Sequence, residues 1–171
     1  MESVIAAKFD PPVWMGNQLR RDMLLRRLDS ALTHRLTLVH GPAGYGKTSL
    51  LGQWRASLDP ARVRVAWLAL ERDDCELERL THYLASAIQR ATSDIDVQTL
   101  TGNVPSRAAL SAIVSQLTAT KDNPFVLILD DLHHADAAPV LEFLSSLIRL
   151  APANCHFVFA SRGCPWLGQS I

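Results

Sequence analysis

The chain has 171 residues, which is enough for one domain of ordinary size and too few for two full ones. Hydrophobic residues make up 48% and charged residues 20%, which excludes a largely disordered chain, and no apolar run is long enough to span a membrane. Seventeen Lys and Arg residues balance seventeen Asp and Glu residues, so the chain lacks the basic excess of a nucleic-acid-binding protein. We therefore expect a single globular core, no membrane segment and no DNA binding by this chain itself.

The cysteines and the N-terminus indicate the compartment. Cys75, Cys155 and Cys164 are odd in number and form no C-x-x-C pair, which argues against a disulfide framework and against a structural zinc site. Residues 1–10 contain one basic residue and no apolar run of signal-peptide length. We therefore expect a protein of the reducing cytoplasm.

Short β-rich runs alternate with helical patterns along the chain, which predicts βαβ units around a parallel sheet. An amphipathic helix is expected over residues 19–32, with several arginines on or near its polar side. The predicted strands cover residues 36–40, 63–70, 125–130 and 156–161, and are mostly apolar, as in strands covered on both faces. Further helices are predicted at 77–91, after Ser106, and at about 139–150, with a loop at 99–105.

A glycine-rich segment follows the first predicted strand and precedes an apolar helix start. It reads Gly41-Pro42-Ala43-Gly44-Tyr45-Gly46-Lys47-Thr48 and matches the phosphate-loop pattern G-x-x-x-x-G-K-[ST]. The glycines let several backbone N–H groups point inward, and the helix N-terminus adds partial positive charge where phosphates bind. Lys47 is expected to reach the β and γ phosphates, Thr48 to offer its hydroxyl to Mg²⁺, and Ser49 to complete the nucleotide-binding segment. A glycine-rich turn without a ligand explains this match poorly.

The third predicted strand delivers two carboxylates at its C-terminal end, where ligands bind in α/β proteins. Asp130 is expected to hold Mg²⁺ through water, and Asp131 to orient or deprotonate the water that attacks the γ-phosphate. The alternative for Asp131 is a cap of the following turn. His133 is expected to hydrogen-bond near this water and His134 to be a solvated loop residue, because two adjacent histidines without a third ligand rarely bind a metal.

The last predicted strand ends in Ser161 and Arg162. If this strand lies between the two strands that carry the motifs, Arg162 stands near the γ-phosphate and can sense it through charge-assisted hydrogen bonds. A surface arginine without such a role is the alternative. The segment Thr120-Lys121-Asp122-Asn123 lacks the N/T-K-x-D spacing, so GTP selectivity has no support.

Together these residues resemble the nucleotide-binding domain of the STAND class of P-loop ATPases, and among them the large ATP-binding LuxR-type (MalT-like) transcription regulators. The resemblance covers nearly the whole chain. It rests on the phosphate loop, on Val65-Ala66-Trp67-Leu68-Ala69-Leu70, on the D-D-x-H pattern at 130–133, and on Ala160-Ser161-Arg162. It implies a three-layer P-loop fold of the ASCE type, with ATP or ADP and Mg²⁺ as cofactors.

The resemblance also implies roles and domains that the residues alone do not give. Arg21 matches a basic residue that lies close to the nucleotide in the family, although the proline-rich lead-in is only partly kept. We expect residues 1–35 to form an N-terminal segment with the first helix, and residues 36–171 a truncated ATPase core. The sensor and helix-turn-helix domains of full members are expected to be absent from this chain.

Three functions are compatible with these motifs. The leading interpretation is a slowly hydrolysing ATP/ADP switch that controls transcription through other domains. A second is an AAA+ motor or loader ATPase, which predicts Asp-Glu where this chain has Asp130 and Asp131. A third is an interaction module that holds ADP passively.

The family order of strands, 5-1-4-3-2, has a consequence for assembly. The four predicted strands correspond to 1 to 4, and Pro165 and Gly168 interrupt the residues after Gly163, so no fifth strand is expected. The first strand would then form an open apolar edge, and open edges recruit partners. We expect the isolated chain to self-associate or to be only marginally soluble.

Overall fold

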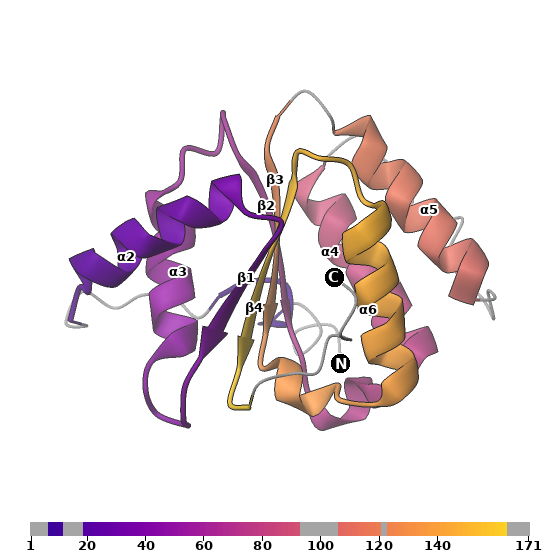
Figure 1. Ribbon diagram of the computed structural model, residues 1–171, viewed down its shortest axis with the longest axis horizontal. Helices are drawn as coiled ribbons and strands as arrows, with labels where there is room; N and C mark the ends of the chain where they lie inside the picture. Colours follow the sequence, from indigo (N-terminus) through magenta and orange to yellow (C-terminus); the bar gives the residue numbers. More distant parts are fainter. Residues whose placement is uncertain (1–6, 12–18, 93–105, 121–122, 164–171) are drawn as a thin grey trace.

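The computed structural model describes residues 7–11, 19–92, 106–120 and 123–163, and within these ranges four strands form one parallel sheet (Figure 1). The strands are β1 (Leu36–His40), β2 (Arg64–Ala69), β3 (Phe125–Asp130) and β4 (Cys155–Ser161). Their order is β1-β4-β3-β2, and every neighbouring pair is parallel. The predicted α/β class and the placing of the last strand between the two motif strands are therefore confirmed.

Helices cover both faces of the sheet, which gives three layers (Figure 1). On one face lie α2 (Asp22–Asp29) and α3 (Lys47–Ser57). On the other face lie α4 (Leu77–Ala91), α5 (Ser106–Ala119) and α6 (Ala138–Leu150). Short 3₁₀ turns, η1 (Ser30–Thr33), η2 (Arg72–Cys75) and η4 (Leu132–His134), complete the connections described.

The alternation of side chains along the strands divides the core into two parts. In β3, Val126 and Ile128 pack into the apolar cluster under α2 and α3, whereas Leu127 and Leu129 pack into the larger cluster under α4, α5 and α6. All six residues of β3 are buried. The continuous apolar run that predicted a doubly covered strand thus matches its place in the sheet.

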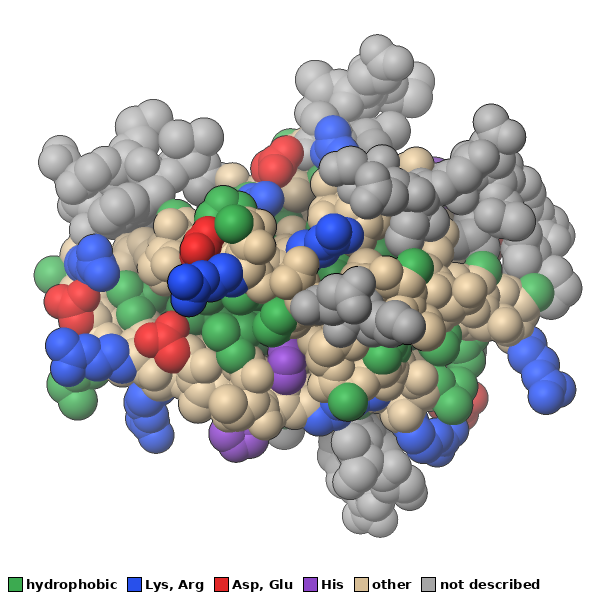
Figure 2. Space-filling view, turned by 90° about the horizontal axis from the view of Figure 1, so that it is seen from above, with side chains coloured by type: hydrophobic (Ala, Val, Ile, Leu, Met, Phe, Trp, Pro, Cys, Tyr) green, Lys and Arg blue, Asp and Glu red, His purple; other side chains and the backbone are tan. Residues whose placement is uncertain are grey.

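The first helix is shorter than predicted. Residues 19–21 are not helical, because Arg21 adopts φ −105° and ψ 70°, and the helical pattern continues after Asp29 only as the 3₁₀ turn η1. The amphipathic pattern is nevertheless present, since Leu25 and Leu28 are buried. Leu19 and Met23 are 80% and 81% exposed, and Figure 2 shows hydrophobic side chains among charged ones at the α2 end of the molecule.

Other predicted boundaries differ slightly or fall outside the described residues. Strand β2 is one residue shorter at each end than the predicted 63–70. The predicted loop at 99–105, Cys164 and the residues after it lie outside the described ranges. Cys75 and Cys155 are free thiols. Within the described residues, no helix is both long enough and apolar enough to cross a membrane.

Candidate functional site

Three strands bring the predicted site residues together at the C-terminal ends of the strands. Because β1, β3 and β4 are parallel, their C-terminal ends all lie at the same end of the sheet. The phosphate loop follows β1, the two aspartates stand at the end of β3, and Arg162 follows β4. Residues more than 100 positions apart in the sequence therefore meet here, as ligand-binding residues do in open α/β sheets.

The backbone of the loop depends on two glycines. Gly44 has φ 79° and Gly46 has φ 71°, both in the left-handed region that side chains with a Cβ rarely adopt. Helix α3 begins directly afterwards at Lys47, and the N–H of Leu50 donates to the Gly46 carbonyl at 2.9 Å to close its first turn. The free N–H groups and the positive end of the α3 dipole therefore face the loop.

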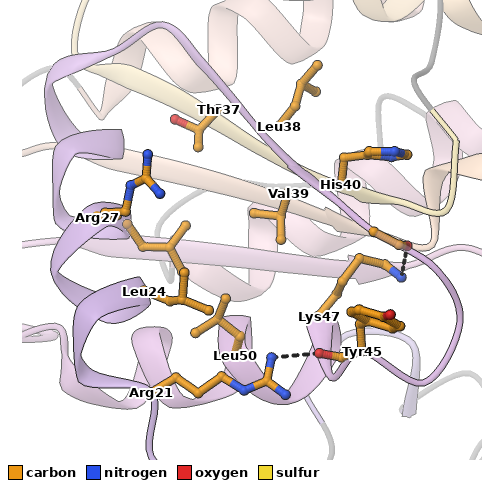
Figure 3. Close-up of a pocket in the computed structure, with 12 residues that line it drawn as sticks. Arg21, Leu24, Arg27, Thr37, Leu38, Val39, His40, Tyr45, Lys47 and Leu50 are labelled. Atoms are coloured by element: carbon orange, nitrogen blue, oxygen red, sulfur yellow. Dashed lines mark hydrogen bonds between the residues drawn. The ribbon is translucent and has the colours of Figure 1, made fainter.

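The Lys47 ammonium group is held by the loop itself. Its Nζ donates to the carbonyl oxygens of Gly41, at 2.8 Å, and Pro42, at 3.0 Å. Figure 3 shows the Lys47 side chain turned back along the loop toward the Gly41 carbonyl. The cation that the motif assigns to phosphates is thus paired with neutral oxygens, which a charged ligand can replace.

Arg21 contacts the loop from the start of α2. Its Nη1 donates to the Tyr45 carbonyl at 2.7 Å, as Figure 3 shows, and a Cβ placed on Gly46 would lie 3.4 Å from its Nη2. A pocket of about 530 Å³ opens beside this contact, between α2, β1 and the loop (Figure 3). Its lining includes Arg27 and Lys47 in addition to Arg21, with apolar side chains of α2, β1 and α3.

Thr48 and the aspartates of β3 form a connected group. The Asp131 N–H donates to Asp130 Oδ1 at 3.0 Å, and the Thr48 side chain lies close enough to influence the Asp130 carboxylate. Burial raises the pKa of Asp130, with a smaller contribution from the Asp131 charge, while Thr48 and Lys47 act in the opposite direction. Asp131 adopts φ 55°, and its side chain makes no capping hydrogen bond to η4, which leaves the carboxylate available.

His133 lies among these charged groups. Its Nδ1 is 3.7 Å from Asp131 Oδ1, beyond hydrogen-bond distance, and neither buried ring nitrogen has a partner among the described residues. Burial and the charges of His134, Arg162 and Lys47 lower the pKa of His133, against the influence of Asp131. His133 and His134 lie with their ring centroids 4.0 Å apart.

This arrangement fits a magnesium-bound triphosphate. The loop presents an exchangeable ammonium group, Thr48 and Asp130 place a hydroxyl and a carboxylate together, and the unpartnered nitrogens of His133 lie beside them. Mg²⁺ binds through few protein oxygens and keeps several waters, so this small donor set suffices. Arg162 is exposed at the end of β4, and its charge reaches His133.

Comparison with known families supports the same chemistry. The family model described as "AAA ATPase domain" matches residues 14–159. The chain belongs to this family. The AAA ATPase domain is also 36% identical over 169 residues to the HTH-type transcriptional regulator MalT of Yersinia pestis (strain Pestoides F), and 34% identical to MalT of Yersinia enterocolitica. Each alignment covers 96% of this chain and 18% of the regulator. The resemblance to MalT-like regulators is thereby confirmed.

Solved structures confirm the P-loop ATPase fold of the domain. The Aeropyrum pernix Orc1 protein, solved in complex with DNA, matches with a TM-score of 0.64 at 17% identity and covers 91% of this chain and 42% of that one. The Walker-type ATPase PABY2304 of Pyrococcus abyssi matches with a TM-score of 0.60 at 17% identity, over 88% of this chain and 47% of that one.

The sequence did not reveal the buried ion pair behind the end of β2. Lys8 Nζ lies 2.7 Å from Asp74 Oδ2 and 3.0 Å from Glu71 Oε2, and Asp74 is fully buried. Asp74 Oδ2 also accepts the Glu71 N–H at 2.8 Å, which fixes η2 where the chain leaves β2. The partners are 66 residues apart, so no local pattern reports them.

Proposed function

We propose that this AAA ATPase domain binds ATP and ADP with Mg²⁺, hydrolyses ATP slowly, and serves as the nucleotide switch of a cytoplasmic transcription regulator. The observation that carries the proposal is the joint placement of Lys47, Thr48 and Asp130 at the carboxyl edge of the sheet. The similarity to MalT supports the link to transcription. Specific DNA binding belongs, in this proposal, to other parts of such a regulator, because this chain has no net basic charge.

The ground-state role of the loop is to bind the phosphates. Backbone N–H groups of residues 43–49, at the N-terminus of α3, hold the phosphate oxygens, and Lys47 leaves its two carbonyl partners to pair with the β and γ phosphates. Thr48 and Asp130 hold Mg²⁺, the latter through water. Mg²⁺ held there would supply positive charge that offsets the negative charge of the phosphates.

Hydrolysis depends on the residues beyond Asp130. Asp131 directly follows the buried Asp130, and its side chain makes no capping hydrogen bond. Its carboxylate can therefore orient the attacking water and accept a proton from it. The neutral imidazole of His133 can donate one hydrogen bond and accept another, to the water or the γ-phosphate. Arg162 senses the γ-phosphate from the end of β4.

The base and ribose occupy the pocket beside α2. It adjoins the phosphate loop, and Leu24, Val39 and Leu50 offer an apolar surface for a purine. Arg21 connects this pocket to the loop through the Tyr45 carbonyl, so it contacts the nucleotide region from the base side.

The deciding experiment measures bound nucleotide and steady-state ATP turnover on the purified chain, with Lys47→Ala and Asp131→Ala variants. A slow switch binds both nucleotides and turns over slowly, a motor or loader turns over rapidly, and a passive module holds ADP without turnover. Lys47→Ala should lose most triphosphate affinity, and Asp131→Ala should keep binding while losing hydrolysis. Near-normal ATP affinity in Lys47→Ala by calorimetry contradicts the assignment of the loop.

A further inference from the structure

The outer edge of β2 carries backbone groups that the sheet does not use. The N–H of Arg64 donates to Pro124 and that of Leu70 donates to Asp130, both at 3.0 Å, so residues 64, 66, 68 and 70 turn their backbone groups toward β3. In a strand the intervening residues face the other way. Val65, Trp67 and Ala69 therefore direct their N–H and C=O groups to the outer edge.

Only the C-terminal end of this edge is covered within the described part of the chain. The Ala69 N–H donates to the Lys8 carbonyl at 2.8 Å, although Lys8 lies in a turn, which shows that an outward N–H of this edge can bond to another segment. Beyond Asp10 that segment turns away toward α3, where Pro11 lies beside Gly52. The outward backbone groups of Val65 and Trp67 have no backbone partner there among the residues described.

A groove runs along the uncovered part between α3 and α4. Two adjoining hollows of about 320 and 210 Å³ share Arg55, Val65 and Ala91 in their walls. One extends to Trp67 and Phe9, and the other to the connection between α3 and β2. The groove therefore has room for side chains on either side of a strand laid against β2.

The charge of the groove selects the occupant. Arg55, Arg64 and Arg90 line the two hollows, and among the described lining residues Asp10 is the one acidic side chain. Asp10 Oδ1 is 3.7 Å from Arg55 Nη1, too far for a hydrogen bond, and Asp10 is 65% exposed. Among the described residues, Arg64 and Arg90 have no carboxylate partner, although Arg90 lies over the Phe9 ring, and Arg55 has only the long contact with Asp10. A second copy of the same edge would place arginine against arginine.

We propose that the outer edge of β2 at Val65–Trp67 binds an extended acidic segment of a partner protein as an added strand. Backbone hydrogen bonds to Val65 and Trp67 give affinity, and carboxylates that reach Arg55, Arg64 and Arg90 give selectivity. The surface lies at the opposite edge of the sheet from β1 and is separate from the nucleotide site.

The test is an NMR titration of the ¹⁵N-labelled chain with a blocked seven-residue peptide of alternating Glu and Val. The matched probe is the peptide with Lys in place of Glu. The Glu peptide should shift the amides of Val65 and Trp67 and the Trp67 indole N–H, which has no partner among the described residues. Equal shifts with the Lys peptide, or shifts confined to the cationic phosphate loop, overturn the proposal.

Two variants separate charge from backbone pairing. The double variant Arg55→Glu, Arg64→Glu should bind the Glu peptide about tenfold more weakly and the Lys peptide more tightly. The matched double variant Arg62→Glu, Arg72→Glu changes residues outside the groove and should leave both affinities unchanged. Val65→Pro removes one outward N–H without touching the bonds to β3, and it should also weaken binding. Unchanged affinity in a variant whose thermal unfolding shows it to be folded overturns the proposal.

Discussion

At Asp130, stability and the proposed magnesium binding have opposite requirements. Its pKa is raised by burial, so its contribution to stability is fully present below the ordinary value of 3.8 and is lost as pH rises through the higher folded pKa. At neutral pH the buried carboxylate therefore costs free energy, which a metal ion or a neutral side chain relieves.

We predict that Asp130→Asn raises the free energy of unfolding by about 0.5–2 kcal/mol at pH 7 without ligands. The gain should shrink near pH 4, where more of the wild-type carboxyl group is protonated, and Mg²⁺-dependent stabilisation by ATP should disappear. Urea unfolding at both pH values measures this, with exposed Asp136→Asn as control. A destabilised Asp130→Asn at pH 7 would show that the carboxylate is well paired in the ligand-free fold.

Arg162 tests nucleotide discrimination. The Arg162 side chain is exposed, and its charge lowers the pKa of His133. It therefore lies near the position that we propose for the γ-phosphate. We predict that Arg162→Ala lowers ATP affinity about tenfold and leaves ADP affinity nearly unchanged. Calorimetry with both nucleotides measures the ratio, and Arg26→Ala on exposed α2 is the control. An unaltered ratio identifies Arg162 as a surface residue.

Among the elements, α6 and β4 depend on one arginine that precedes β1. Arg35 donates from Nε to the Ile148 carbonyl at 2.7 Å and from Nη1 to Pro152 at 2.5 Å, and it also reaches Ala151 and Cys155. These carbonyls lie at the C-terminal end of α6 and the start of β4, where no helical N–H serves them. The planar fork of the guanidinium group satisfies them together.

We predict that Arg35→Met lowers the free energy of unfolding by about 2–3 kcal/mol, because buried carbonyls lose their donors. Arg35→Lys should restore only part of the loss, since an ammonium group cannot match the fork. Urea unfolding measures both, and Arg149→Met in the last turn of α6 is the control. If Arg149→Met costs as much as Arg35→Met, the general charge at the helix end is responsible instead.

The sequence predicts those features of the fold that depend on neighbouring residues. The bounds of β1 and β3 were predictable because an apolar run is closed by the phosphate-loop glycine or by aspartates. Periodicity located the buried face of α2 but not its ends, which depend on the backbone of Arg21 and Asp29. The Arg35 contacts join residues 113 to 120 positions apart, and nothing periodic marks them.

The same limit applies to the site. The phosphate loop and the β3 aspartates were predictable, because each occupies consecutive positions at a strand end. The Lys47 bonds to loop carbonyls and the Arg21 contact with Tyr45 were not, because side-chain geometry in a ligand-free loop depends on what else lies within reach.

For the whole molecule, β1 forms the edge of the sheet opposite β2. The Phe157 N–H donates to Arg35 and the Gly41 N–H donates to Ser161, so Leu36, Leu38 and His40 turn their backbone groups outward. Within the described residues β1 pairs with β4 alone, and Leu38 is 41% exposed. Such an edge favours strand pairing between copies.

We predict that the isolated chain self-associates and that Leu38→Lys suppresses this, because a charged side chain on an edge strand opposes pairing. Light scattering coupled to gel filtration over a range of concentrations measures it. Leu150→Lys, which replaces another exposed leucine at the end of α6, should leave association unchanged. A monodisperse wild-type monomer would show that the β1 edge is protected.

The bonds of Lys47 to the Gly41 and Pro42 carbonyls also affect which ligands can bind, because a ligand must displace these carbonyls from the ammonium group. A ligand that binds the Lys47 ammonium group competes with two carbonyl oxygens of the same loop. Because these oxygens belong to the same chain, their effective concentration is high. A ligand with little negative charge, such as a nucleoside or monophosphate, gains too little from the ammonium group to displace them. We therefore expect the loop to favour polyphosphates over monophosphates and uncharged nucleosides in a cellular mixture.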